Sequence, residues 1–161
     1  EKMADSLKPA RMKARLFVNG TEEREGIDYH ETYSPVTRLT GFNHTCAWAA
    51  CKPTWLYEHS DITCAFPHEE SERILCRMPK DLREYRIIDN EKVEILYWVT
   101  NLYGRHDAGR KFVTGHRQWF LERGFIATTA EPCIFKRTCA KGTAIVCAYV
   151  DDCAWLVSTQ D

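Results

Sequence analysis

The sequence lacks several features that define common protein classes. It contains no run of about eighteen apolar residues, the length that a transmembrane helix requires. The amino terminus does not combine a basic stretch with an apolar one, so a secretory signal is not expected, and its abrupt start suggests a fragment of a longer chain. Repeats and low-complexity tracts are also missing. These absences favour an intracellular protein without a membrane partner.

Cysteine, in contrast, is frequent, with eight residues in a chain of 161. The cysteines form no closely spaced pair of the kind that binds zinc, and most lie in apolar company, as Cys46, Cys64 and Cys147 do. That setting favours reduced, buried thiols over a disulfide framework or a metal site. Apolar residues make up 44% of the chain, which is enough to bury a core.

Charge is nearly balanced overall but unevenly placed. The net charge is −1, which does not by itself indicate nucleic-acid binding. Residues 1–15 carry five basic and two acidic side chains, and residues 104–123 carry the same numbers. Two basic patches around an acidic centre suit a protein that grips a phosphate backbone, although any single lysine or arginine is more typical of a solvated face. The acidic stretch 22–31 is interpreted as a solvated loop.

The acidic centre is the segment Tyr149-Val150-Asp151-Asp152. The apolar runs 144–148 and 153–157 have the pattern of buried strands, which predicts a tight β-hairpin with this segment at its tip. Two adjacent carboxylates held there need a partner, and a divalent cation is the obvious one. Adjacent aspartates are equally ordinary turn residues, because they bond to their own backbone.

A third carboxylate, Asp61, has a comparable setting. It lies in residues 55–66, where aromatic and β-branched residues indicate a strand that runs into a loop. A two-cation phosphoryl-transfer site needs oxygen ligands from several carboxylates brought together from separate elements. Asp61 and Asp151 could meet only through the fold.

The remaining pattern predicts an α+β order of elements. The helix at 42–51 is expected to stop before Pro53, and the helix at 108–123 is expected to end at Gly124. Phe112 and Trp119 are expected in the core. Besides the hairpin, strands are predicted at 15–18, 93–99 and 134–136, with a loop over 20–35.

Six ordered blocks of the chain stand out together. They are Lys13 to Leu16 with Asn19-Gly20; Gly26 to Val36 with Arg38; Asp61 to Phe66; Asn101 to Gly104 with Ala108 and Arg110; Gly124-Phe125 with Pro132 to Phe135; and Tyr149 to Asp152. Together they resemble the reverse transcriptase domain of copia-type retrotransposons over almost the whole chain. A single block would be weak support, whereas six in the same order make chance a poor explanation.

The resemblance implies a polymerase fingers and palm, with an antiparallel palm sheet backed by helices and the catalytic β-hairpin near the carboxyl terminus. Residues 1–161 would be one reverse transcriptase domain fragment, fingers-like over about 1–52 and mainly palm-like over 53–161, without thumb or ribonuclease H. The implied location is intracellular, in a cytoplasmic particle or the nucleus.

The implied activity is that of an RNA-directed DNA polymerase, a nucleotidyltransferase. Asp61, Asp151 and Asp152 would be the catalytic residues and the ligands of two Mg²⁺ ions, with Mn²⁺ as an alternative. The implied partners are an RNA or DNA template with its primer, deoxynucleoside triphosphates, and the remainder of a Pol polyprotein.

Five further residues would bind the nucleotide. By resemblance to the opening fingers strand, Lys13 and Arg15 would donate charged hydrogen bonds to the triphosphate. Phe66 lies where the family has a bulky gate against a ribose 2′-hydroxyl, and core packing is an equally weighted role. Tyr103 and Gly104 would support the pair of template base and nucleotide, because glycine allows close backbone approach.

The chain also departs from the family pattern. Arg105-His106-Asp107-Ala108-Gly109 stands where leucine, lysine, glutamine, a small residue and proline are common. These departures are typical of a diverged or decaying copy of the element. The alternatives are a catalytically silent nucleic-acid-binding remnant, a two-metal phosphodiesterase, because the same carboxylates serve hydrolysis, and a generic structural domain.

Overall fold

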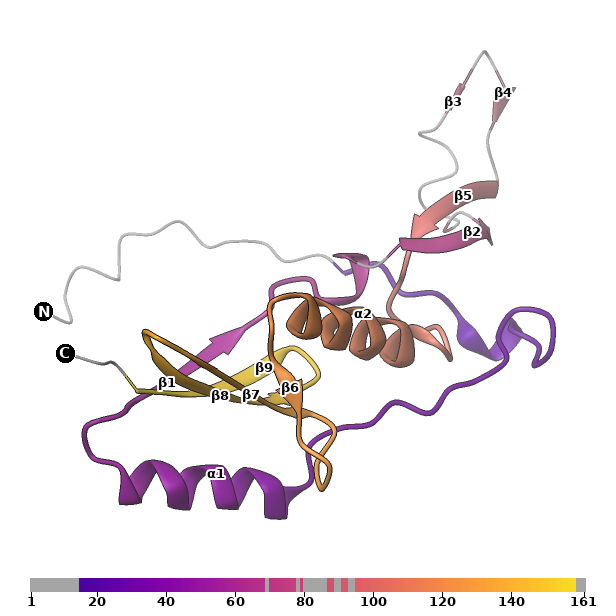
Figure 1. Cartoon of the computed structure of the whole chain (residues 1–161). Helices are drawn as coiled ribbons and strands as arrows, with labels where there is room; N and C mark the ends of the chain where they lie inside the picture. Colours follow the sequence, from indigo (N-terminus) through magenta and orange to yellow (C-terminus); the bar gives the residue numbers. More distant parts are fainter. Residues whose placement is uncertain are drawn as a thin grey trace, which may run out of the picture.

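The computed structural model describes residues 15–68, 70–77, 79, 87–88, 91–92 and 95–158. In this part of the chain, an antiparallel sheet lies between two α-helices, and a two-stranded ribbon projects away from it (Figure 1). The mixed composition and the antiparallel sheet agree with the expected fold class. Its division into polymerase fingers and palm stays a prediction. Lys13 and the rest of the first basic patch up to residue 14 lie outside the described residues.

The main sheet has five strands in the order β1-β9-β8-β7-β6, and all neighbours are antiparallel. Its central hairpin is buried because the apolar runs flanking Tyr149 to Asp152 occupy β8 and β9, as the sequence predicted. β1 lies at one edge, paired only with β9 and exposed along its length. The strands are β1 Leu56–Asp61, β6 Ile126–Ala127, β7 Ile134–Cys139, β8 Gly142–Tyr149 and β9 Asp152–Val157.

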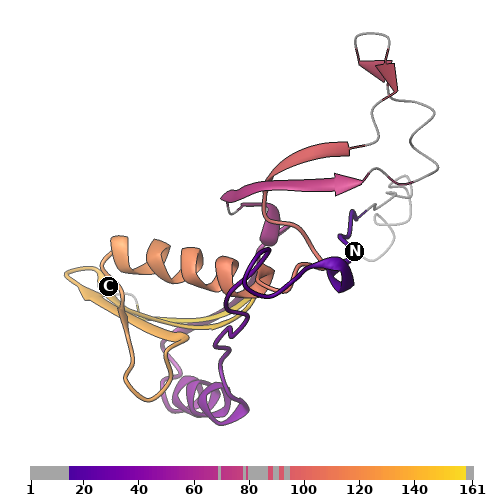
Figure 2. The ribbon, with the colours of Figure 1, turned by 90° about the vertical axis from the view of Figure 1, so that its right-hand side faces the viewer.

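Helix α2, Ala108–Glu122, covers one face of this sheet (Figure 2). Phe120 is fully buried there and stacks on Phe135 of β7 with ring centroids 4.6 Å apart. Burying one such side chain stabilises the fold by about 1.5–3 kcal/mol. The helix ends as predicted, because Gly124 adopts φ +77°, a conformation that other residues rarely take.

Trp119 does not join this core, so that prediction is wrong. Its side chain is 43% exposed and lies under the guanidinium of Arg123, 3.9 Å from the ring centroid. The buried stripe of α2 instead contains Ala108, Phe112 and Phe120, which are four or eight residues apart. Residue 119 is seven residues after Phe112, on the same side of the helix, so helical spacing alone does not explain its exposure.

Helix α1, Leu39–Cys51, lies on the opposite face of the sheet (Figures 1 and 2). It starts three residues before the predicted Phe42 and ends before Pro53, as expected. Gly41 and Thr45 are its buried residues. A Cβ on Gly41 would lie 3.0 Å from the Glu131 side chain, so this turn of the helix sits close to the loop before β7.

The other elements are shorter or stand apart. The strand predicted at 15–18 is reduced to one parallel bridge between Phe17 and Tyr103. The strand predicted at 93–99 is observed over 95–99 as part of β5, and residues 93–94 lie outside the described residues. No described helix is both long and apolar enough to cross a membrane. The remaining elements are the 3₁₀ helices η2 Gly20–Glu22 and η3 Phe66–His68, the ribbon of β2 Glu70–Arg77 and β5 Ile95–Thr100, and the pair of β3 Ile87–Ile88 and β4 Glu91–Lys92.

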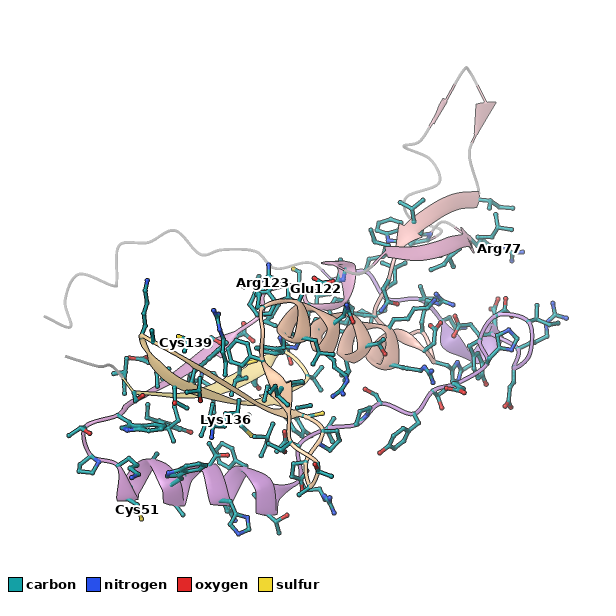
Figure 3. All side chains as sticks on the ribbon, viewed as in Figure 1. Cys51, Arg77, Glu122, Arg123, Lys136 and Cys139 are labelled. Carbon is teal, nitrogen blue, oxygen red and sulfur yellow. The ribbon has the colours of Figure 1, made fainter. Side chains whose placement is uncertain are left out.

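The eight cysteine thiols are all free. Cys133, Cys147 and Cys153 are buried, and burial raises the pKa of the Cys153 thiol to about 12. The expectation of buried thiols is wrong for Cys64, which is exposed because it lies in the loop after β1. Figure 3 labels two further exposed cysteines, Cys51 at the end of α1 and Cys139 at the end of β7.

Candidate active site

The three predicted catalytic carboxylates lie at one end of the sheet, Asp61 and Asp152 on adjacent strands and Asp151 in the turn before β9. β1 pairs with β9 in a register that places Asp61 directly opposite Asp152. Just beyond this pair, the Ile62 N–H donates to the carbonyl oxygen of Asp151 at 2.9 Å. Directly opposed residues of antiparallel strands have Cα atoms about 4.5–5.5 Å apart. Residues far apart in the sequence are therefore neighbours at the hairpin tip.

The hairpin tip is a two-residue turn made of Val150 and Asp151, between the paired residues Tyr149 and Asp152. Val150 adopts φ +52°. The favoured two-residue hairpin turns need this region, but a β-branched residue there costs roughly 1–3 kcal/mol. Backbone strain of this kind clusters at functional sites, which is consistent with a functional hairpin.

The side chains of these carboxylates are accessible. Asp61 and Asp152 are exposed and Asp151 is half-buried. The Asp152 Oδ1 lies 3.1 Å from Nε2 of His59, which is on the same face of β1 as Asp61. Carboxylate oxygens are the donors that Mg²⁺ prefers, so the chemistry of the residues fits the expected ion. Among the described residues, however, no three His, Cys, Asp or Glu side chains are grouped so that they could hold a metal.

Two of the predicted nucleotide-binding residues, Arg15 and Phe66, meet around the ring of a third, Tyr103. The Tyr103 ring centroid lies 6.0 Å from the guanidinium carbon of Arg15 and 4.9 Å from the Phe66 ring. Phe66 is half-buried in η3 and also contacts Phe112, with centroids 5.8 Å apart. Both proposed roles of Phe66, gate and core residue, are compatible with this position. We call Arg15, Phe66, Tyr103 and Gly104 the Tyr103 platform.

Gly104 is held in close backbone contact with the segment before η2. The Val18 N–H donates to the Tyr103 carbonyl at 2.8 Å, and Gly104 has φ +93°. A Cβ at Gly104 would lie 2.2 Å from the Val18 carbonyl oxygen, and one at Gly20 would lie 2.3 Å from the Gly104 carbonyl oxygen. Neither approach leaves room for a side chain, so both positions require glycine.

A buried ion-pair cluster follows directly after Gly104. The Arg105 side chain is 5% exposed, and its Nε lies 2.8 Å from Oε1 of Glu23, which is 10% exposed. Arg105 also donates from Nη2 to the Asp28 carbonyl at 2.9 Å. The Glu23 Oε2 accepts from the His106 backbone N–H at 2.8 Å. Glu23 is therefore not part of a solvated loop, and that interpretation of residues 22–31 is wrong for it.

These contacts change the acidity of Glu23. Burial raises the pKa of its carboxyl, but the hydrogen bonds from Arg105 and His106 outweigh that effect, and the net pKa is lowered. Asp107 pairs with Lys111 through Oδ2 at 2.8 Å. Its Oδ1 lies 3.4 Å from Arg105 Nη2, within ion-pair range, although it accepts no hydrogen bond. The sequence offered one signal for the cluster, an arginine in a tight turn where the family commonly has leucine.

The second basic patch, residues 104–123, is largely engaged within the protein. Arg105 and Lys111 belong to the cluster described above, and Arg110 pairs with Glu31. Arg117 donates to the Pro132 carbonyl, and Arg123 covers Trp119. These side chains therefore offer less free charge for a phosphate backbone than the sequence suggested.

The segment before α1 is anchored to the hairpin. The Thr37 hydroxyl donates to the Ala148 carbonyl at 2.8 Å, and Pro35, Ala148 and Val150 line a small cavity of about 130 Å³ between the end of β8 and α2. His116 of α2 also lines it, and burial lowers the pKa of its imidazole. The hairpin turn therefore packs mainly on apolar side chains.

Comparison with known proteins identifies the family. Residues 1–161 match the family described as "Reverse transcriptase (RNA-dependent DNA polymerase)". The chain is 30% identical over 147 residues to the Retrovirus-related Pol polyprotein from transposon TNT 1-94 of Nicotiana tabacum, covering 90% of this chain and 11% of that protein. It is 27% identical over 144 residues to the Retrovirus-related Pol polyprotein from transposon RE1 of Arabidopsis thaliana, covering 88% and 9%.

The chain therefore belongs to the reverse transcriptase family, and the resemblance to copia-type retrotransposons is confirmed. It spans about a tenth of the length of the curated relatives it matches, 11% and 9% for the two named here. No solved structure matches it.

Proposed function

We propose that this chain carries the catalytic centre of an RNA-directed DNA polymerase encoded by a copia-type retrotransposon. The observation that carries the proposal is the register of β1 and β9, which sets Asp61 opposite Asp152 with Asp151 in the adjoining turn. Membership of the reverse transcriptase family supports it. The reaction is extension of a DNA primer on an RNA template, inside the cell and as part of a Pol polyprotein.

Asp61 and Asp151, supported by Asp152, would hold two Mg²⁺ ions, which when bound activate the primer 3′-hydroxyl and neutralise the leaving pyrophosphate. The chain contributes the placement of these ligands. The central hairpin fixes Asp151 and Asp152, and the β1 ladder fixes Asp61 against them. Asp61 and Asp152 lie on exposed strand ends, where their side-chain rotamers can change without a backbone change.

The Tyr103 platform would bind the incoming nucleotide. Arg15 supplies a charged donor for the triphosphate, with Lys13 as its expected neighbour along the chain. Tyr103 and Gly104 lie beneath the pair of template base and nucleotide. Phe66, in contact with Tyr103, acts as the steric gate that excludes a 2′-hydroxyl.

One alternative is favoured by a specific observation. Asp152 is engaged with His59, and the described residues hold no ready group of three metal ligands. Both findings are compatible with a nucleic-acid-binding remnant that no longer catalyses.

Primer extension with Mg²⁺ separates these functions. Asp61→Asn and Asp151→Asn keep the side-chain shape but lose the anionic ligand, so each should reduce extension by about a hundredfold or more. Glu58→Gln is the matched control, because Glu58 is an exposed carboxylate on β1 that lies opposite Trp155, away from the hairpin tip. Circular dichroism should show an unchanged fold for all three variants.

Three results would contradict the polymerase. Metal-independent binding of primer and template without extension identifies the silent remnant. Cleavage in the absence of nucleotides identifies a phosphodiesterase. Extension that survives both aspartate substitutions removes these residues from the site.

A further inference from the structure

We propose that Arg105 is a positioning residue that holds the Tyr103 platform against the segment before η2, through its buried pair with Glu23. The effect on nucleotide binding rests on the proposed function. The positioning itself rests only on contacts among the described residues, and Arg105 is one of the positions where this chain departs from its family.

The cluster fixes the backbone of the turn and not merely one side chain. The Glu23 carboxylate accepts from Arg105 through one oxygen and from the backbone N–H of His106 through the other. Two successive residues of the turn are thereby tied to a single buried group. The ring of His106 adds a further contact, 3.0 Å from Glu23 Oε2.

The segment 23–29 wraps the same arginine. The Asp28 carbonyl accepts from Arg105 Nη2, and the Tyr29 ring stacks on His106 with centroids 4.6 Å apart. This wrapping is possible because the segment closes on itself: Gly26, at φ +81°, donates to the Tyr29 carbonyl at 2.8 Å. A block of sequence that is distinctive of the family therefore helps to bury the ion pair of Arg105 and Glu23.

The ion-pair cluster and the Tyr103 platform are adjacent in the sequence. Arg105 follows Gly104, whose backbone is in direct contact with Val18 and Gly20. Glu23 lies just beyond η2, which begins at Gly20. The loop and the turn are thus joined at two points, by the Val18 to Tyr103 hydrogen bond and by the Glu23 to Arg105 pair. Loss of the Glu23 to Arg105 pair weakens the Val18 to Tyr103 hydrogen bond. Arg15 is then no longer held over the Tyr103 ring.

Charge, not size, is the property that position 105 requires in this chain. Leucine there would leave the Glu23 carboxylate buried without its partner, which is strongly unfavourable. Removing both charges, with Arg105→Leu and Glu23→Gln together, eliminates that penalty. Lysine at 105 keeps the charge but lacks the planar fork that reaches Glu23 and the Asp28 carbonyl at once, so it should restore only part of the effect.

Hydrogen exchange tests the positioning without any assay of activity. In Arg105→Leu, exchange of the Val18 amide should accelerate at least tenfold, while amides of the β8 and β9 ladder keep their rates. Arg105→Leu with Glu23→Gln should return most of the protection. Arg77→Leu and Glu22→Gln are matched controls, since both side chains are exposed and lie outside the cluster (Figure 3 labels Arg77).

Steady-state incorporation of a single nucleotide tests the consequence. A misplaced platform should raise the KM for the nucleotide by about tenfold to a hundredfold in Arg105→Leu, with kcat nearly unchanged and KM recovered in the double variant. An inactive wild-type Pol polyprotein that contains this chain would refute the proposed function alone, because Val18 exchange still decides the positioning. Unchanged Val18 exchange in Arg105→Leu, or no recovery in the double variant, would overturn the proposal.

Discussion

Replacement of Gly104 by alanine should destabilise the protein through two separable effects. The first is backbone strain, because alanine at φ +93° costs about 1–2 kcal/mol. The second is the clash of the new Cβ with the Val18 carbonyl oxygen, 2.2 Å away. Relief of that clash requires the segment to move and breaks the Val18 to Tyr103 hydrogen bond, a further loss of about 0.5–1.5 kcal/mol. The expected total is about 1.5–3.5 kcal/mol.

Gly124→Ala isolates the strain from the clash. Gly124 also has positive φ, at +77°, but a Cβ there would meet its nearest neighbour, Arg137 Nε, at 3.9 Å, an ordinary contact. Both substitutions reduce the entropy of the unfolded chain equally, so this contribution cancels in the comparison. The difference between the two variants therefore measures the backbone contact between Gly104 and Val18.

Urea unfolding followed by circular dichroism supplies the two free energies of unfolding. Gly104→Ala should lose about 1 kcal/mol more than Gly124→Ala, the value of the broken hydrogen bond. Equal losses in the two variants would refute the close approach of the turn to Val18. A Gly104→Ala protein with unaltered stability would refute the strained conformation as well.

Three other predictions follow from the structure. Phe120→Ala, at the centre of the core between α2 and the sheet, should lower the free energy of unfolding by about 3–5 kcal/mol, measured by urea titration. Phe66→Val should raise ribonucleotide incorporation relative to deoxyribonucleotide in matched single-turnover assays, and unchanged discrimination would leave Phe66 a packing residue. The folded-state pKa of Glu23 is lowered, so its stabilising effect is present above its ordinary pKa of 4.5 and is lost as the pH falls through the lower folded value. Wild type should therefore be more stable than Glu23→Gln at neutral pH, and acid titration should remove this difference.

The sequence predicted the elements whose pattern is local. The apolar runs around Tyr149 to Asp152 specify a hairpin by themselves, and Gly124 ends α2 wherever the helix packs. The start of α1 was placed too late because no capping residue marks it: the N-cap is Arg38, whose side chain makes no capping hydrogen bond. Trp119 was misplaced because its spacing from Phe112 gives its side of the helix but not whether another element covers that turn.

Contacts between distant residues were beyond the reach of such patterns. The sequence suggested that Asp61 and Asp151 lie close together, but only the pairing of β1 with β9 shows where Asp61 lies. The Glu23 to Arg105 pair shows the same limit. Each residue alone has the pattern of a solvated charge, and their burial depends on the loop 23–29 closing over the turn.

The edge position of β1 determines how the site opens over time. Edge strands are held by a single ladder and separate from a sheet at lower free energy than central strands do. At one end of this ladder, Asp61 is followed by Ile62, whose N–H donates to the Asp151 carbonyl in the hairpin turn. This additional backbone hydrogen bond ties β1 to the turn beside the carboxylates. Separation of Asp61 from the hairpin must therefore break this bond as well as the ladder.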